Sequence, residues 1–286
     1  MPNRRLLFST PVPTPVLEWC LNHRDGILMV GSCFTENIGG RLVASGFDCK
    51  VNPFGIQYNP LSMAECLRRC LTGEKVGEEH LVQHNGLWHS WLHHGSFSSA
   101  DKNECLRRCN DAIDRTYHFL TEKCDTLMLT MGTAFVYELV EPTESVRVVS
   151  NCHKVPQRLF AKRLVGMDEI EAAWEPIWEM LKVLPREVRV LFSISPIRHW
   201  ADGAHGNQLS KATLMLAVER MLGERRGYFP AYEIVMDELR DYRFYDEDML
   251  HPSKMAEEVV WQRLKDALMD EEISDDIDRI CDYLCL

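Results

Sequence analysis

A serine and a cysteine stand side by side where a buried strand is expected to turn into a helix. Residues 26–30 (Gly-Ile-Leu-Met-Val) form a short apolar run bounded by turn-forming residues, which is typical of a buried strand. Phe34, Ile38 and Leu42 then recur every four residues, as on one face of a helix. The run Gly31-Ser32-Cys33 therefore lies where open α/β sheets bind ligands and where helix N–H groups stabilise an oxyanion.

A carboxylate and a histidine near the other end of the chain are suited to activating such a nucleophile. Asp248 and His251 are three residues apart, in a loop before a helix that we expect to begin at Ser253, a good N-cap residue. A carboxylate on one ring nitrogen fixes the tautomer, while the other nitrogen accepts a proton. The spacing predicts a triad in which the Ser32 hydroxyl lies about 2.6–3.2 Å from the His251 ring.

The thiol of Cys33 is an alternative nucleophile, since thiolates attack more readily than hydroxyls. Adjacent residues in a strand-to-helix turn point apart, so only one of Ser32 and Cys33 can face His251. A cysteine at such a position is also commonly a small buried apolar residue.

The elements that position these residues alternate along the chain, which favours an α/β fold with a central, mostly parallel sheet. Strands are expected at 27–31, 49–51, 126–130, 188–194 and 233–236, and helices at 33–45, 61–71, 102–121, 168–182, 210–222 and 253–269. We expect one domain over residues 1–286. Its core spans about 25–269, with a hairpin or loop insertion at 73–100, an irregular excursion at 141–165 and an acidic tail at 270–286.

The composition excludes several classes of function. A formal net charge of −11 over 286 residues repels polyanions, so neither nucleic acid nor an anionic membrane is an expected partner. The apolar stretch after the basic N-terminal residues is too short for a signal peptide, and no apolar stretch is long enough to span a bilayer. Eleven cysteines without an export signal indicate a reducing compartment, and we expect a cytoplasmic protein.

Six motifs in order resemble those of one family. They are Gly31-Ser32-Cys33-Phe34, residues 52–60 (NPFGIQYNP), Gly132-Thr133-Ala134, residues 195–199 (SPIRH), residues 228–233 (YFPAYE) and Asp248-Met249-Leu250-His251. The chain resembles the GSCFA family over about residues 25–265, with Thr35 where the family name has alanine. GSCFA proteins are similar to SGNH/GDSL hydrolases, which are α/β esterases and lipases. The resemblance implies an SGNH-like three-layer fold and favours Ser32, His251 and Asp248 as the triad, with no metal or organic cofactor.

An oxyanion hole needs two or three hydrogen-bond donors. The expected donors are the N–H groups of Ser32 and of Gly55, since glycine lets the backbone come close to the acyl oxygen. SGNH relatives usually add an asparagine side chain where this sequence has Ala134. We expect either Thr133 or Asn151 to take its place.

Other residue clusters have both a functional and a structural interpretation. Trp88 and Trp91, with His89, His93 and His94, are typical of a structural hairpin, although they could line a carbohydrate-binding rim or hold a metal. Arg198 and His199 follow a predicted strand and are expected to line the cleft. The repeated sequence CLRRC at 66–70 and 105–109 favours core packing over a four-cysteine metal site.

These features together predict a serine esterase that hydrolyses an O-acyl ester, with an acetylated sugar as the example. Two alternatives remain: an O-acyltransferase that uses the same triad, and a binding module whose triad is idle. The substrate is then a small-molecule or carbohydrate ester. The sequence gives no prediction of the oligomeric state.

Overall fold

A five-stranded parallel sheet forms the centre of the computed structural model, which describes residues 9–142 and 146–284, with side chains to residue 280. The strand order is β10-β9-β5-β1-β2, and every neighbouring pair is parallel. The bounds are β1 (Gly26–Gly31), β2 (Asp48–Val51), β5 (Cys124–Met131), β9 (Arg189–Ile194) and β10 (Arg226–Phe229). The predicted parallel sheet is confirmed.

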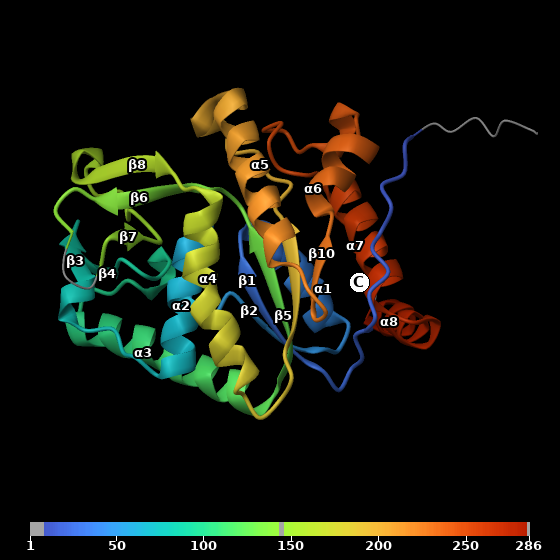
Figure 1. Cartoon of the computed structure of the whole chain (residues 1–286), viewed down its shortest axis with the longest axis horizontal. Helices are drawn as coiled ribbons and strands as arrows, with labels where there is room; N and C mark the ends of the chain where they lie inside the picture. Colours follow the sequence, from blue (N-terminus) through green and yellow to red (C-terminus); the bar gives the residue numbers. More distant parts are fainter. Residues whose placement is uncertain (1–8, 143–145, 285–286) are drawn as a thin grey trace, which may run out of the picture.

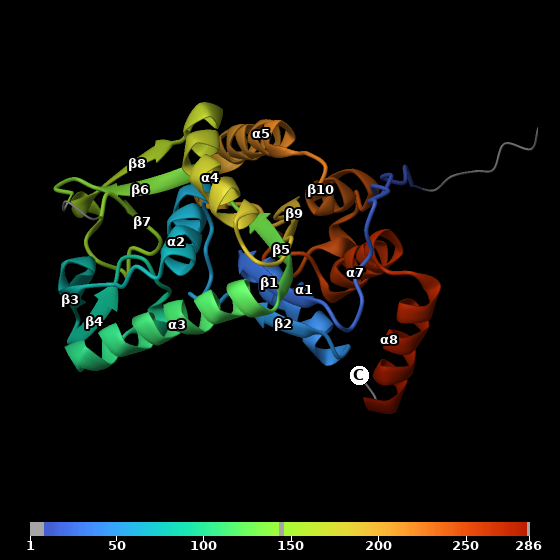
Figure 2. The same ribbon diagram turned by 60° about the horizontal axis from the view of Figure 1, so that its bottom comes forward.

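Helices cover both faces of this sheet (Figure 1, Figure 2). On one face lie α2 (Pro60–Thr72), α3 (Lys102–Glu122), α4 (Met167–Lys182) and α5 (Gly203–Met221), and on the other α1 (Cys33–Ala44) and α7 (Lys254–Leu268). Successive residues of a strand point to opposite faces, so Leu28 and Val30 pack with the first group while Ile27 and Met29 pack with the second. Burial on both sides explains why the run is apolar without alternation.

Two smaller antiparallel sheets extend from the core. The insertion contains the predicted hairpin, β3 (Leu81–His84) and β4 (Leu87–Ser90), joined by Asn85-Gly86, both with positive φ as a two-residue hairpin turn requires. The excursion at 141–165 is more regular than expected, because β7 (Val148–Val149) and β8 (Phe160–Leu164) flank β6 (Phe135–Leu139). Short 3₁₀ turns lie at Glu78–His80, Gly95–Phe97, Gln157–Leu159, Trp200–Asp202 and Tyr242–Phe244.

The predicted strand at 233–236 is wrong. The segment is helical, as α6 (Ala231–Glu233) followed by a π-helical turn (Ile234–Glu238), and the fifth strand is instead β10. Pro230, which has no N–H, follows β10 directly. Ile234 and Val235 are fully buried in this helical turn, as they would be in a central strand. A short apolar run therefore does not distinguish the two.

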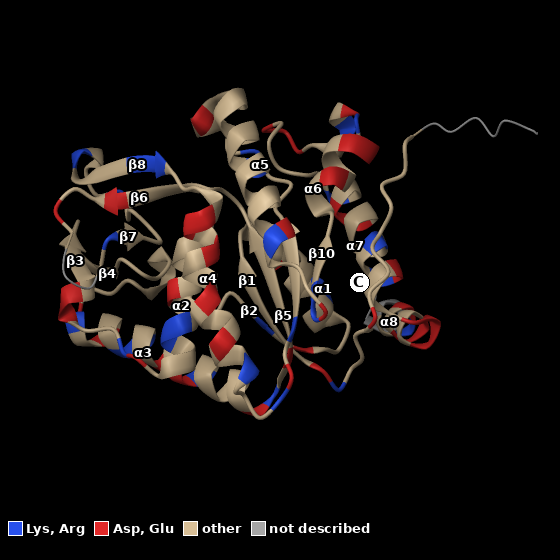
Figure 3. Cartoon of the chain, viewed as in Figure 1, with Lys and Arg blue, Asp and Glu red and all other residues tan. Residues whose placement is uncertain are grey.

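Two helix boundaries also differ from expectation. Helix α5 begins at Gly203 rather than at 210, because its first two turns lack an apolar period. The acidic tail is helix α8 (Glu271–Leu284), and it packs against the core through buried Ile277. Among the described residues, no helix combines the length and apolarity needed to cross a bilayer. Charged residues of both signs lie on the helices and on the loops at the amino ends of the strands (Figure 3).

Gly31 ends β1 at a point where the backbone has no room for a side chain. A Cβ atom built there would lie 2.4 Å from the Thr130 carbonyl oxygen and 2.4 Å from the Thr35 hydroxyl. Both distances are shorter than van der Waals contact, so the close approach of β1 to β5 requires glycine.

We therefore expect Gly31→Ala to destabilise the protein by about 1–3 kcal/mol, as overpacking of a filled core does. Gly40→Ala is the matched control, because nothing lies within 4 Å of a Cβ at that exposed position of α1. The control should be neutral or stabilising by up to about 1 kcal/mol. Chemical denaturation of both variants measures the difference, and equal stabilities would contradict the packing argument.

Candidate active site

A cavity of about 450 Å³ opens at the carboxyl ends of the strands. Of the residues predicted to be functional, those in its wall are Cys33, Thr133, Asn151, Arg198, His199 and His251. The rest of the wall includes Tyr58, Phe135, Tyr137, Cys152, Lys162, Trp200 and Asp202. The structure thus brings together residues from five of the six motifs or their immediate neighbours, at the place where α/β sheets carry their ligands.

The predicted histidine–aspartate pair is formed. Asp248 Oδ2 lies 2.5 Å from His251 Nδ1, and Asp248 Oδ1 accepts the backbone N–H groups of Leu250 at 2.8 Å and of His251 at 2.9 Å. These backbone hydrogen bonds, followed by the bond to the His251 ring, lower the pKa of Asp248 to about 2. The carboxylate is therefore ionised at any ordinary pH and holds the ring with Nε2 directed away from it.

The side chain that faces His251 is Cys33. Its Sγ lies 4.0 Å from His251 Nε2, and both residues line the cavity. Burial raises the pKa of the Cys33 thiol, although the N–H groups of Cys33 and Phe34 at the start of α1 act in the opposite direction. The resting group is thus a protonated thiol beside a base.

The predicted hydrogen bond between Ser32 and His251 is absent from the described structure. The Ser32 hydroxyl donates instead to the Ser195 hydroxyl at 3.0 Å, and the residue is 1% exposed. Ser32 is the N-cap residue of α1, and its side chain points inward between the ends of the strands. Cys33, one residue later, then points into the cavity, as expected for adjacent residues of such a turn.

Two predicted oxyanion donors already have partners. The N–H of Ser32 donates to the Thr130 carbonyl at 3.3 Å, and that of Gly55 donates to the Asn52 carbonyl at 2.7 Å. Gly55 lies outside the cavity wall. It has φ +74° and packs against His94, so glycine is needed there for the turn and the close contact.

Thr133 and Asn151, the other two predicted donors, both line the cavity. The Thr133 hydroxyl is occupied, since it lies 3.0 Å from the Ser210 hydroxyl and accepts the N–H of Phe135. Asn151 Oδ1 accepts the N–H of His153 at 2.8 Å, which fixes the carboxamide. The Asn151 NH₂ group makes no hydrogen bond to any described residue. Of the four predicted donors, Asn151 is therefore the one that is free to bind an oxyanion.

The 52–60 motif ties together the strand ends below the cavity. The Asn52 side chain accepts the Gly31 N–H at 2.9 Å, and the Gly31 carbonyl accepts the Gln57 N–H at 2.9 Å. The Tyr58 carbonyl accepts the N–H groups of Gly132 and Thr133. This loop therefore holds the ends of β1 and β5 in register and places the Tyr58 ring, which sequence reasoning did not single out, in the wall.

The tryptophans of the insertion lie away from the cavity wall. Trp91 is 6% exposed and packs with Val146, Val149 and Val155, while the ring of Trp88 lies beneath the Lys102 ammonium group. His93 is buried, and burial lowers its pKa to about 3. No group of three metal-ligating side chains able to hold an ion occurs within residues 9–142 and 146–280. The four cysteines of the CLRRC pairs are buried in the core.

Comparison with known proteins agrees with this picture of the motifs. The GSCFA family model matches residues 26–264. The chain is a member of the GSCFA family. No curated protein matches the sequence. A solved structure titled as a carbohydrate esterase family 3 from Talaromyces cellulolyticus aligns with TM-score 0.38 and 10% identity, over 88% of this chain and 99% of that one. That likeness is distant, and the geometry of the GSCFA cavity is interpreted from its own residues.

A buried lysine beneath the cavity of this GSCFA protein was not predicted. The Lys211 ammonium group donates to the carbonyls of Gly132 and Ser195, both at 2.7 Å, and the residue is 1% exposed. Burial lowers the pKa of Lys211 to about 7. Burial, followed by the nearby Lys211 charge, also lowers the pKa of His199 to about 4, so that ring is neutral. The only sequence signal was a lysine on the apolar face of α5 with Leu214 and Val218.

The titration of Lys211 should be visible in the stability of the protein. Its pKa is about 7 when folded, against the ordinary 10.5, so between these pH values the unfolded chain binds a proton that the folded chain does not. Stability should therefore rise with pH in this window, by up to about 1.4 kcal/mol per pH unit. We expect this slope to disappear in Lys211→Met when urea unfolding is followed from pH 6 to about 10.

The control is Lys254→Met, which removes an exposed lysine and should retain the slope of the wild type. Parallel pH profiles for the wild type and Lys211→Met would show that Lys211 stays protonated in the folded protein.

Proposed function

We propose that this GSCFA protein hydrolyses an O-acyl ester with Cys33 as nucleophile, His251 as general base and Asp248 as the residue that orients the base. The observation that carries the proposal is the 4.0 Å approach of Cys33 Sγ to His251 Nε2, with the ring held by Asp248 from the other side. A nucleophile beside a base that a third group orients is the recurring arrangement of covalent acyl transfer.

The first half of the reaction forms a thioester. Cys33 Sγ attacks the carbonyl carbon of the ester while His251 Nε2 takes the thiol proton. The tetrahedral intermediate collapses, the bond to the alcohol oxygen breaks, and His251 returns the proton to that oxygen. Because burial raises the pKa of the Cys33 thiol, this proton transfer is required at neutral pH.

The second half releases the acid. Water enters as the new nucleophile and gives a proton to His251, whose side chain is 47% exposed at the mouth of the cavity. Collapse of the second tetrahedral intermediate breaks the thioester, and the proton returns to the Cys33 sulfur. The access of water to His251 favours hydrolysis over transfer of the acyl group to another alcohol.

The donors for the oxyanion lie on two sides of the cavity. The Asn151 NH₂ group lies in the wall, and the N–H groups of Cys33 and Phe34 interact with the Cys33 sulfur at the amino end of α1. In this arrangement Asn151 supplies the side-chain hydrogen-bond donor that Ala134 lacks. The rings of Phe135 and Tyr137 line the same cavity, which suits an alcohol with a flat or cyclic body such as a sugar.

Alanine substitutions at the two adjacent positions should separate the two nucleophiles. We expect Cys33→Ala to lower kcat/KM for p-nitrophenyl acetate by roughly 10⁴-fold or more, because the covalent route is lost. Ser32→Ala removes only a hydrogen bond to Ser195 and should lower it by less than about tenfold. Steady-state kinetics on both variants, with unfolding curves as a check, measure this difference.

The reverse pattern would assign the reaction to Ser32 as the nucleophile. Full activity in both variants would place the reaction on another residue, whereas a wild-type protein that hydrolyses no ester would favour a binding module. Adding an alcohol as acyl acceptor and measuring the new ester distinguishes a transferase from a hydrolase.

A further inference from the structure

We propose that the cavity takes an ester carrying an anionic group, a carboxylate or a phosphate, and that Arg198 binds this group. The proposal deepens the proposed function, because it takes Cys33 and His251 in the same cavity as the reacting pair. Arg198 lies next to that pair in space: it lines the same cavity, and its backbone N–H donates to the Leu250 carbonyl, one residue before His251.

The Arg198 guanidinium has no carboxylate partner among the residues that the structure describes. It lies over the Trp200 ring, 4.6 Å from its centre, and its charge also acts on the hydroxyl groups of Tyr232 and Tyr245. Stacking on an aromatic ring fixes the plane of a guanidinium without using its N–H groups, and this leaves them free to bind an anion in a bidentate manner. Arg198 is half-buried, so an anion bound there would be partly shielded from water.

The charge of the cavity wall is also unusual for this protein. The described wall contains two cationic side chains, Lys162 and Arg198, and one carboxylate, Asp202, which is paired with Lys162. His199 adds no positive charge, because burial lowers its pKa to about 4. The charged side chains of the described wall therefore leave an excess positive charge at Arg198, in a chain whose formal net charge is −11, and the ionised Asp248 lies outside the wall behind His251. A neutral substrate would not require an unpaired arginine in the wall. An anionic substrate would, because the negative charge of the whole protein repels it and a local positive charge offsets this repulsion.

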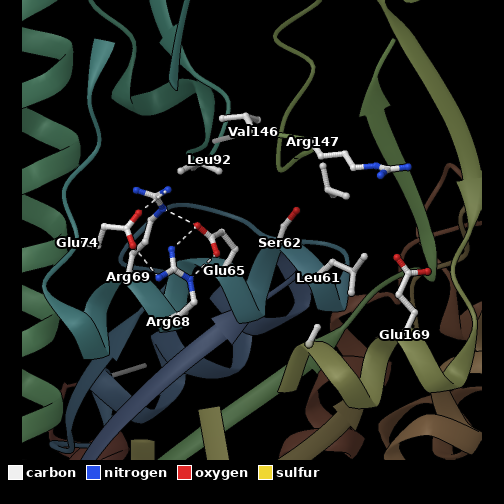
Figure 4. Close-up of a pocket in the computed structure, with 12 residues that line it drawn as sticks. Leu61, Ser62, Glu65, Arg68, Arg69, Glu74, Leu92, Val146, Arg147 and Glu169 are labelled. Carbon is white, nitrogen blue, oxygen red and sulfur yellow. Dashed lines mark hydrogen bonds and ion pairs between the residues drawn. The ribbon is translucent and has the colours of Figure 1, made fainter. Parts of the chain in front are cut away.

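A second cavity, of about 630 Å³ beside α2, also contains arginines, but these are paired with carboxylates (Figure 4). There Arg68 and Arg69 are each tied to Glu65 and Glu74, so their charges are satisfied within the protein. The charges of these two arginines are thus neutralised by nearby carboxylates. Arg198 differs from them: it has no such partner among the described residues, and it lies in the cavity that contains the candidate nucleophile.

Esters that differ only in charge test the proposal. p-Nitrophenyl hemisuccinate and p-nitrophenyl butyrate compare an anionic acyl group with a neutral one, and 4-acetoxybenzoate and 4-methylphenyl acetate make the same comparison on the alcohol side. We expect kcat/KM to favour the anionic member of at least one pair by about tenfold to hundredfold, the range for a hydrogen bond to a charged group. Arg198→Gln should remove this preference, and Arg198→Glu should reverse it.

Arg226→Gln is the matched control. The Arg226 guanidinium stacks on Trp178 at 5.0 Å, but it lies at the amino end of β10, away from the cavity. The Arg226→Gln substitution removes the same charge and the same kind of stacking as Arg198→Gln. It should leave the ratio of kcat/KM values for the anionic and neutral esters at that of the wild type. A wild-type ratio near one in both pairs, or a ratio that survives in Arg198→Gln, would overturn the proposal.

Alkylation of Cys33 tests the same point without ester hydrolysis. Iodoacetate and iodoacetamide both lose iodide to a thiolate and form a sulfur–carbon bond, but only iodoacetate carries a carboxylate. We expect Arg198→Gln to lower the ratio of iodoacetate to iodoacetamide rates at Cys33 by about tenfold, measured by mass spectrometry of the Cys33 peptide. An unchanged ratio overturns the anion subsite. If Arg198→Gln lowers this ratio but the wild-type protein hydrolyses no ester, the anion subsite stands and the proposed function is rejected.

Discussion

Three elements of the fold meet at Ser195, and the arrangement of the cavity depends on how they are joined there. The Ser195 hydroxyl accepts the hydrogen bond from Ser32, and the Ser195 carbonyl accepts one from Lys211. The first contact turns Ser32 inward at the end of β1. The second joins the end of β9 to that of β5, because Lys211 also donates to Gly132. With Ser32 held below, the next side chain, Cys33, faces His251.

This junction is built from buried polar groups, which proteins tolerate only when they are hydrogen-bonded. Lys211 is the extreme case, since it has carbonyl oxygens but no carboxylate as partners. Its burial lowers its pKa to about 7, so its charge costs stability at low pH. A positive or easily protonated group beneath the cavity favours negative charge above it, which the proposed thiolate and tetrahedral intermediate would require. Under the proposed function, the stability that the burial of Lys211 costs would be offset by its electrostatic effect on the reaction, a trade that is common at functional sites.

Much of the fold was predictable because its signals are local. The apolar run at 26–30 and the four-residue period after it predicted β1 and α1, and the Asp248–His251 spacing predicted a contact within one loop. The segment at 233–236 was assigned wrongly because its three apolar residues, Ile234 to Met236, fit a strand and a helical turn equally well. The triad and the acyl substrate remain proposals, whereas membership of the GSCFA family is confirmed by the match over residues 26–264.

The proposal of Cys33 rather than Ser32 as nucleophile could not be made from the local sequence. It depends on Ser195, which is 163 residues away along the chain, and on the packing of α1 against the sheet. Lys211 and Arg198 are similar cases. The only local sign of the burial of Lys211 is its spacing from Leu214 and Val218, and nothing near Arg198 in sequence shows that it lacks a carboxylate partner. The 52–60 motif was recognised from the sequence, and Gly55 was predicted as an oxyanion donor. In the structure its N–H is bonded to Asn52, its glycine serves a turn, and the backbone of the motif joins the ends of two strands.

Locating the acyl group on the enzyme tests the central claim most directly. Wild-type protein mixed with an activated acetyl ester and quenched in acid within the first turnovers should carry an acetyl group on the peptide that contains both candidate residues. Fragmentation of this peptide should place the group on the sulfur of Cys33, as a thioester that neutral hydroxylamine removes. An acetyl group on the oxygen of Ser32 that resists neutral hydroxylamine would contradict the account.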